Sequence, residues 1–75
     1  MTESLLVGVD VGTGSARAGV LTGRGVLLGR AEHPIAMNRA DANHAEHDSA
    51  QIWRAVCAAV RDAMTAAAAD PAQVV

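Results

Sequence analysis

The sequence predicts an α/β domain made of a three-stranded antiparallel meander, one helix and the start of a further strand. Three observations support this fold class. Apolar segments rich in branched residues alternate with glycine-containing turns in the first half of the chain. In the second half, apolar residues recur at helical spacing up to an Asp-Pro pair. After the Asp-Pro pair, an apolar run begins again at Gln73-Val74-Val75 with the two valines.

The meander is expected to contain three strands, at residues 5–11, 16–21 and 26–33. The first strand is apolar on both faces, so we expect it to be central in the sheet and covered on both sides. The third strand carries Arg30 and Glu32 in alternation with small residues, which favours a more exposed position. It should end near Pro34, because proline lacks a backbone donor.

A polar and aperiodic segment from Ile35 to His47 predicts a loop of about a dozen residues, long enough to belong to a functional site. Within it, His44 and His47 flank Glu46. A metal site there would need a third ligand and an ordered scaffold. Histidines that face solvent or order the loop are therefore the default interpretation.

The helix is expected to begin at Asp48, an N-cap residue with Gln51 three positions later. Alanine-rich sequence supports it as far as Ala69, and the Asp70-Pro71 pair ends it. Its buried stripe is predicted to contain Ile52, Val56, Ala59, Val60, Ala63 and Met64.

Two single residues of this helix stand out in the composition. Trp53, the one aromatic residue of the chain, lies beside the apolar stripe, so a place in the core or at the sheet–helix interface is expected. Cys57 is the one cysteine, and within an alanine-rich helix it is predicted to be a small buried hydrophobe.

The most informative stretch is residues 8–17, Gly-Val-Asp-Val-Gly-Thr-Gly-Ser-Ala-Arg. Backbone N–H groups in its turn can approach phosphate oxygens closely, because Gly12 and Gly14 carry no side chain. Asp10, at the end of the preceding strand, can hold a hydrated magnesium ion against the same phosphates. The combination indicates nucleotide chemistry.

Two better-known phosphate loops are excluded by spacing. The Rossmann fingerprint needs a third glycine and a following helix, but counting from Gly12 the sixth residue is Arg17 and a strand follows. The Walker loop needs Gly-Lys before a hydroxyl residue, and this chain contains no lysine. A hairpin whose turn is merely glycine-rich remains the structural alternative.

The stretch resembles the phosphate-binding first hairpin of the sugar-kinase/actin/Hsp70 superfamily, and most closely that of the FGGY carbohydrate kinases. The matching positions are Asp10, Gly12, Thr13, Ser15 and Arg17. Gly14 departs from the family pattern, where a hydroxyl residue is commoner. Residues 45–53, Ala-Glu-His-Asp-Ser-Ala-Gln-Ile-Trp, resemble the family's Glu-(Gln/His)-Asp-Pro-x-x-x-Trp segment, so the resemblance extends over nearly the whole chain.

This resemblance implies the opening segment of a ribonuclease-H-like (actin-like ATPase) fold, with the next strand parallel to the first. Residues 1–75 would be the N-terminal part of the first actin-like domain of a larger kinase, because the apolar run at residues 73–75 looks like a strand cut short. The implied activity is ATP-dependent phosphorylation of a small sugar or polyol. The form Gly-Thr-Gly-Ser-Ala-Arg is typical of the ribulokinase-like branch, which favours ribulose or a related pentulose or pentitol.

The resemblance also assigns roles to residues. Asp10 would orient Mg²⁺, and Arg17 would offset negative charge near the phosphates of ATP. The terminal phosphates would be held by the turn that contains Gly12, Thr13, Gly14 and Ser15. The catalytic base and the adenine pocket are expected beyond Val75, so this segment alone is expected to be inactive. By analogy, Trp53 would have a second interpretation as an aromatic surface near the sugar.

The composition of the chain bears on which binding partners and which cell compartment are expected. The net charge of −2 and the lack of a basic run give no footprint for nucleic acid. No apolar stretch approaches the ~20 residues of a membrane span. The acidic, polar N-terminus and the lone cysteine indicate a cytoplasmic protein. A homo-oligomer is compatible with the sequence.

Three other functions remain open from the residues alone. A ribonuclease-H-like nuclease would need further carboxylates, for which Glu46 and Asp48 are candidates, and a basic surface. An actin- or Hsp70-like ATPase scaffold would share the first hairpin but should lack the segment from Glu46 to Trp53. A plain α/β interaction module would use the glycine turn only structurally.

Overall fold

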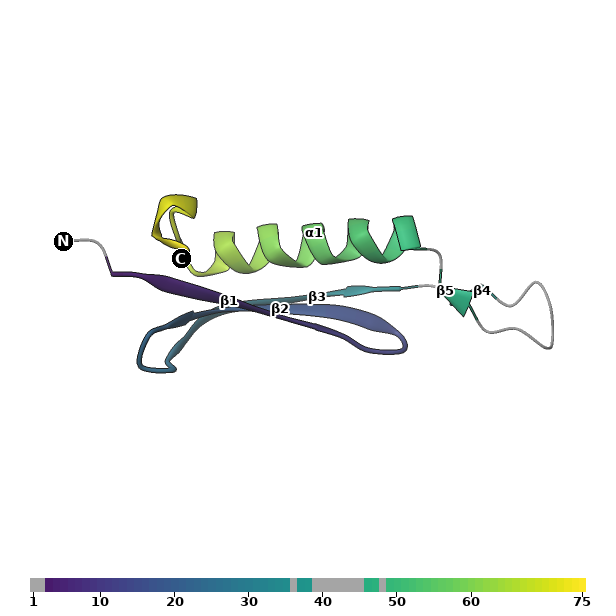
Figure 1. The fold of residues 1–75 in the computed structure, drawn as a ribbon, viewed down its shortest axis with the longest axis horizontal. Coiled ribbons are helices and arrows are strands. Elements are labelled where there is room, and N and C mark those ends of the chain that lie inside the picture. The colour runs from purple at the N-terminus through teal and green to yellow at the C-terminus, as the bar shows by residue number, and fades with distance from the viewer. Residues whose placement is uncertain (1–2, 36, 39–45, 48) are drawn as a thin grey trace.

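The computed structural model describes residues 3–35, 37–38, 46–47 and 49–75. Figure 1 shows one long helix lying along one face of an antiparallel sheet. The sheet contains β1 (Leu5–Val11), β2 (Ser15–Thr22) and β3 (Leu27–Pro34), and the helix is α1 (Ser49–Ala66). The predicted meander followed by one helix is thereby confirmed, with each strand boundary within one residue of the expected position.

The sheet has the order β1-β2-β3, and its register is regular between β1 and β2. Between β2 and β3 the register shifts by one residue next to Val20 and Leu21. Leu21 pairs with Leu27, whereas Val20 pairs with Gly29, so one extra residue of β3 lies in a bulge. Because side chains alternate along a strand, this bulge exchanges the two faces of β3 relative to β2.

The exposure of β1 differs from the prediction that both of its faces are covered. β2 lies in the middle of the three-stranded sheet, and on the other side of β1 the described residues add one parallel bridge, between Leu5 and Val74. Leu6, Val9 and Val11 keep 45–47% of their surface exposed, so β1 is not covered on both sides by the described residues. The helix is the reason, because it lies over β2 and β3 and touches β1 only slightly.

A short antiparallel ladder interrupts the segment that was predicted to be a loop from Ile35 to His47. β4 (Met37–Asn38) pairs with β5 (Glu46–His47), with Met37 opposite His47. The two ends of the expected loop are therefore paired with each other as short antiparallel strands. His44 and Asp48, the expected N-cap, lie outside the described residues.

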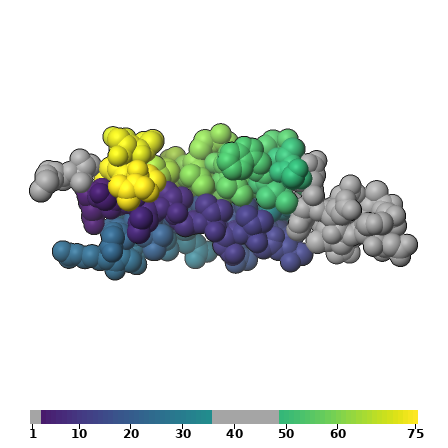
Figure 2. Space-filling view, in the orientation of Figure 1, coloured from purple at the N-terminus to yellow at the C-terminus, as the bar shows by residue number. Residues whose placement is uncertain are grey.

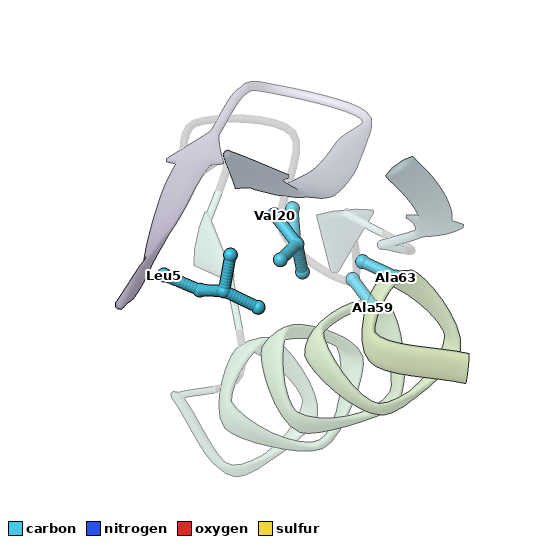
Figure 3. Close-up of a cluster of buried hydrophobic side chains, with 5 residues drawn as sticks. Leu5, Val20, Ala59 and Ala63 are labelled. Carbon is cyan, nitrogen blue, oxygen red and sulfur yellow. The ribbon is translucent and has the colours of Figure 1, made fainter. Parts of the chain in front are cut away.

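The core is built from small residues that let the helix approach the sheet closely. Leu5, Ala18 and Val20 of the sheet meet Ala59 and Ala63 of α1 in one buried cluster (Figure 3). A second cluster forms around Ala16, Ile35 and Ala55. The buried positions of α1 are therefore Ala55, Ala59 and Ala63, while the larger residues of the predicted stripe, Ile52, Val56, Val60 and Met64, flank them and are partly buried.

Gly29 sets the distance between β3 and the helix. A Cβ atom added to Gly29 would lie 2.5 Å from the Ala67 backbone nitrogen and 2.7 Å from the Ala63 carbonyl oxygen. Both neighbours are backbone atoms, which cannot rotate away as a side chain could. The close packing of α1 on β3 therefore requires glycine at this position.

The helix ends at Ala66, three residues before the predicted end at Ala69. The Ala69 N–H donates to the Met64 carbonyl and the Ala68 N–H to the Thr65 carbonyl, at 3.0 Å each, which is the Schellman pattern. Ala68 takes the left-handed conformation that this motif needs, with φ of 52°. The alanines after Ala66 also have high helix propensity, but the Schellman cap ends the helix within this alanine run.

The Asp70-Pro71 pair begins a new element instead of ending α1. Asp70 caps a 3₁₀ turn, η1 (Pro71–Gln73), through a capping box. Its carboxylate accepts from the Ala72 N–H at 3.0 Å, and its own N–H donates to the Gln73 side-chain oxygen at 2.9 Å. The turn redirects the chain back toward the sheet.

After η1 the chain returns to β1. Val74 forms a parallel bridge with Leu5, and the Val75 N–H donates to the Leu5 carbonyl at 3.1 Å. Gln73 adds a bond from its amide to the Glu3 carbonyl at 3.1 Å. In Figure 2 the yellow C-terminal residues lie against the purple start of β1. The predicted parallel relation between β1 and the next segment is confirmed at this bridge.

Two side-chain predictions for α1 are wrong. Trp53 is 67% exposed on the outer surface of the helix and belongs to neither buried cluster. Cys57 is only half-buried. The face of α1 that contacts the sheet is centred on the alanines at 55, 59 and 63, which turns position 53 away from the core.

Candidate functional site

The candidate site lies at the turn between β1 and β2. Asp10 is the penultimate residue of β1, and Ser15 is the first residue of β2. The Gly12 N–H donates to the Ser15 carbonyl at 2.8 Å and closes the turn. The predicted phosphate-binding residues therefore lie in one tight turn between two paired strands.

The two glycines of this turn are not required by the fold. A Cβ atom added to Gly14 would have no other atom within 4 Å, and one added to Gly12 would only reach the Ser15 carbonyl at 3.7 Å. Neither glycine has a left-handed φ. Since neither internal space nor backbone conformation demands glycine, the missing side chains leave the backbone open to a group from outside the turn.

Beside the turn, three charged side chains form a row across the sheet. Asp10 of β1 is paired with Arg17 of β2, which is paired with Glu32 of β3. Arg17 Nε donates to Glu32 Oε2 at 2.9 Å, and Arg17 Nη1 lies 3.7 Å from Asp10 Oδ2. All three side chains are more than half exposed, at 73%, 61% and 52% for Asp10, Arg17 and Glu32 respectively.

The row lies on the face of the sheet that α1 leaves open. The neighbours of Arg17 on β2, Ala16 and Ala18, are buried on the covered side, so Arg17 points the other way. The bulge in β3 is what brings Glu32 to this face. Continued without the bulge, the pairing of Leu21 with Leu27 would place residue 31 opposite Arg17.

Glu32 is the acceptor for two side chains of the site. Its Oε2 also receives the Ser15 hydroxyl at 2.7 Å. The Ser15 hydrogen bond, followed by the hydrogen bond and charge of Arg17, lowers the pKa of Glu32 below its ordinary value. The hydrogen bond and charge of Glu32 in turn raise the pKa of Arg17, with a smaller contribution from Asp10. Each of these two shifts favours the charged form, so Arg17 and Glu32 stabilise one another as an ion pair.

A shallow hollow of about 490 Å³ opens over these residues, and it is lined by Gly14, Ser15, Arg17, Glu32 and Pro34. A larger groove of about 800 Å³ lies between α1 and β1 near η1, but its lining is mostly apolar. Polar groups of the turn converge at the smaller hollow, and a neighbouring hollow of about 430 Å³ shares Arg17 and Glu32 with it, so we assign the candidate site there.

The structure brings together most of the residues predicted from the sequence. Asp10, Ser15 and Arg17 lie side by side, and the turn with Gly12, exposed Thr13 and Gly14 is beside them. Glu32 was not predicted to belong to the site, because its place in the sequence indicated only an exposed strand residue. The signal that could have revealed it is the alternation of Arg30 and Glu32, but the bulge had to be known before Glu32 could be placed opposite Arg17.

The imagined metal site at His44, Glu46 and His47 depends on side chains outside those described. Among the side chains that are described, no three or more His, Cys, Asp or Glu residues gather closely enough to hold a metal ion. Asp10 is an accessible carboxylate, whereas the other carboxylate of the row, Glu32, is held by Ser15 and Arg17. That donor set suits Mg²⁺, which commonly uses one or two protein carboxylates together with phosphate oxygens and water.

The meander, the helix and the parallel return to β1 are those of the opening segment of an actin-like ATPase domain. Residues 5–75 match the FGGY family of carbohydrate kinases, N-terminal domain. The chain therefore belongs to the FGGY family of carbohydrate kinases, as its two motifs predicted.

Individual relatives agree with this assignment. The chain is 46% identical to a D-ribulokinase from Saccharomyces cerevisiae over 68 residues, which are 91% of this chain. It is 49% identical to an FGGY carbohydrate kinase domain-containing protein from Homo sapiens over 73% of the chain. A glycerol kinase from Citrifermentans bemidjiense is 32% identical over 92% of it.

These relatives are much longer than the chain. The matched segment is 10% of the D-ribulokinase, 10% of the human protein and 14% of the glycerol kinase. In the described part of the chain, no helix combines the length and apolar character needed to cross a membrane.

Proposed function

We propose that the full-length protein transfers a phosphoryl group from ATP to a hydroxyl group of a small sugar or polyol, and that residues 1–75 are the N-terminal part of its first actin-like domain. The observation that carries the proposal is the open turn at residues 12–15 beside the exposed carboxylate of Asp10 and the guanidinium of Arg17. In a member of a carbohydrate kinase family, such a turn is suited to the phosphates of the donor nucleotide.

Each residue of the site has a proposed role in phosphate binding. Backbone N–H groups of the turn and the Thr13 hydroxyl donate to the terminal phosphates, and Arg17 offsets their charge. Asp10 orients Mg²⁺, which neutralises phosphate charge when it is bound. Phosphoryl transfer depends mainly on position and charge, and this site supplies part of both.

The base that accepts the proton of the sugar hydroxyl is proposed to lie outside residues 1–75. The adenine pocket is proposed to lie there too, because the relatives are several times longer than this chain. Residues 1–75 alone are accordingly expected to be inactive. We expect the kinase to act in the cytoplasm.

The similarity to a D-ribulokinase and the Gly-Thr-Gly-Ser-Ala-Arg form of the turn favour a pentulose such as ribulose, or a pentitol, as the acceptor. The similarity to a glycerol kinase makes small polyols the second group to test.

The test measures ADP release by the full-length protein with ATP, Mg²⁺ and a panel of pentuloses, pentitols and glycerol. Asp10→Asn keeps the shape of the side chain and removes its charge. We expect sugar-dependent turnover that falls by about 100-fold in this variant, the size typical for loss of one electrostatic contact to the transition state. Glu3→Gln, which changes an exposed carboxylate near the start of β1, is the matched control and should keep full activity. Turnover that no sugar stimulates, or that Asp10→Asn leaves unchanged, would refute the proposal.

A further inference from the structure

We propose that Glu32 is a positioning residue of the phosphate site, which fixes the Ser15 hydroxyl and the Arg17 guanidinium through one carboxylate oxygen and keeps Arg17 from closing on Asp10. This inference rests on the proposed function of the turn. It adds a residue from a third strand to a site otherwise formed by β1 and β2.

The first consequence concerns the direction of the Ser15 hydroxyl. A serine hydroxyl has a single proton, and Ser15 gives it to Glu32 Oε2 at 2.7 Å. The Ser15 oxygen then presents only lone pairs to the hollow. It is an acceptor for Mg²⁺-bound water, and the donors to phosphate come from the backbone of the turn and from Arg17. This alters the role expected for Ser15 from the sequence.

The second consequence concerns Arg17, which lies between two carboxylates. Its Nε donates to Glu32 at 2.9 Å, while Nη1 stays 3.7 Å from Asp10, beyond hydrogen-bonding distance. Because the guanidinium is planar, fixing Nε also fixes the direction of both Nη groups. Without Glu32, the guanidinium would be free to pair closely with Asp10 and would compete there with Mg²⁺.

Glu32 is placed in the site by the fold. The bulge beside Leu21 shifts β3 by one residue and sets Glu32, instead of Ala31, opposite Arg17. The hollow over the site is lined by Glu32 together with Gly14, Ser15 and Arg17. The register shift thus places Glu32 within hydrogen-bonding distance of two side chains of β2, Ser15 and Arg17.

The test uses steady-state kinetics of the full-length protein with Glu32→Gln, with Glu3→Gln as the matched control on an exposed carboxylate near the start of β1. We expect Glu32→Gln to raise the KM for MgATP about three- to tenfold, the range for loss of exposed charged hydrogen bonds. It should also raise the Mg²⁺ concentration needed for half-maximal rate. The KM for the sugar and the melting temperature should stay unchanged.

A double-mutant cycle then asks whether Glu32 acts through its partner. In an Arg17→Ala background, Glu32→Gln should no longer shift the Mg²⁺ requirement, because no guanidinium remains to pair with Asp10. An undiminished shift in that background would overturn the inference.

The outcomes separate this inference from the proposed function. If Asp10→Asn abolishes sugar-dependent turnover while Glu32→Gln leaves the MgATP and Mg²⁺ dependence unchanged, Glu32 is not a positioning residue and the kinase assignment stands. If Glu32→Gln lowers the melting temperature and weakens sugar and ATP binding equally, its role is only structural and the inference is wrong. If neither variant affects turnover, the proposed function itself fails.

Discussion

On the face of the sheet that α1 covers, small residues lie against the helix backbone, so packing restricts which residues fit there. At the turn at residues 12–15 and on the open face, packing restricts the residue type much less. Gly29 and Gly14 illustrate the difference. A methyl group at Gly29 would overlap two backbone atoms, and a methyl group at Gly14 would touch nothing. Where folding does not select a residue, the residue is available for a ligand, and the changes at Gly29 and Gly14 below test this distinction.

The largest effect is expected for Gly29→Ala. The added methyl group would force α1 away from β3, and overpacking of this kind costs about 1–3 kcal/mol. For residues 1–75 on their own, that lowers the melting temperature by roughly 4–8 °C for each kcal/mol. Thermal unfolding followed by circular dichroism measures the change.

The control for this change is Gly23→Ala, in the turn between β2 and β3, where an added Cβ meets no atom within 4 Å. Its melting temperature should stay near that of the unchanged protein. Equal melting temperatures for the Gly29 and Gly23 variants would show that the helix is not in close contact with β3.

A smaller effect, of a different kind, is expected for Gly14→Ala. Its free energy of unfolding should stay within about 0.5 kcal/mol of the original value, as for a surface change without new contacts. If the turn binds phosphates as proposed, the methyl group in the full-length protein would hold them away from the backbone and raise the KM for MgATP about tenfold, equivalent to 1.4 kcal/mol. An unchanged KM would mean that phosphates do not approach the turn at this position.

The smallest effect is expected for Ala68→Gly, and its sign is opposite. Ala68 has a left-handed φ of 52°, which costs an alanine roughly 1–2 kcal/mol and a glycine almost nothing. Part of that gain is lost to the greater freedom of glycine in the unfolded chain, so stability should rise by about 0.5 kcal/mol. Ala66→Gly, within the last turn of α1, should instead lower stability by up to about 1 kcal/mol. Urea unfolding of both variants measures the contrast, and a loss of stability in Ala68→Gly would contradict the assigned cap.

The positions of the three strands and most of the site could be predicted from the sequence. Alternating apolar segments and glycine turns locate strands within a residue because these signals are local. The same holds for Asp10, Ser15 and Arg17, which follow one another along a hairpin with regular register. These three residues lie close together because they belong to the same hairpin.

The remaining features depend on tertiary structure. Glu32 reaches Arg17 only through a bulge, which has no clear signature in the sequence. The end of α1 falls inside a run of alanines of equal propensity, so local preference could not locate it. The exposure of Trp53 and of β1 depends on which face of α1 packs against which strands. That packing is set by the close approach of the helix to Gly29, and the spacing of the large apolar residues does not reveal it.

The exposure of Trp53 has a practical consequence for spectroscopy. It is the only aromatic residue of the chain, so the intrinsic fluorescence of residues 1–75 reports one position on the outer surface of α1. Because that indole is already in contact with water in the folded state, its emission will change little on unfolding. A shift of the emission to shorter wavelength will instead report that another surface has covered the outer face of the helix.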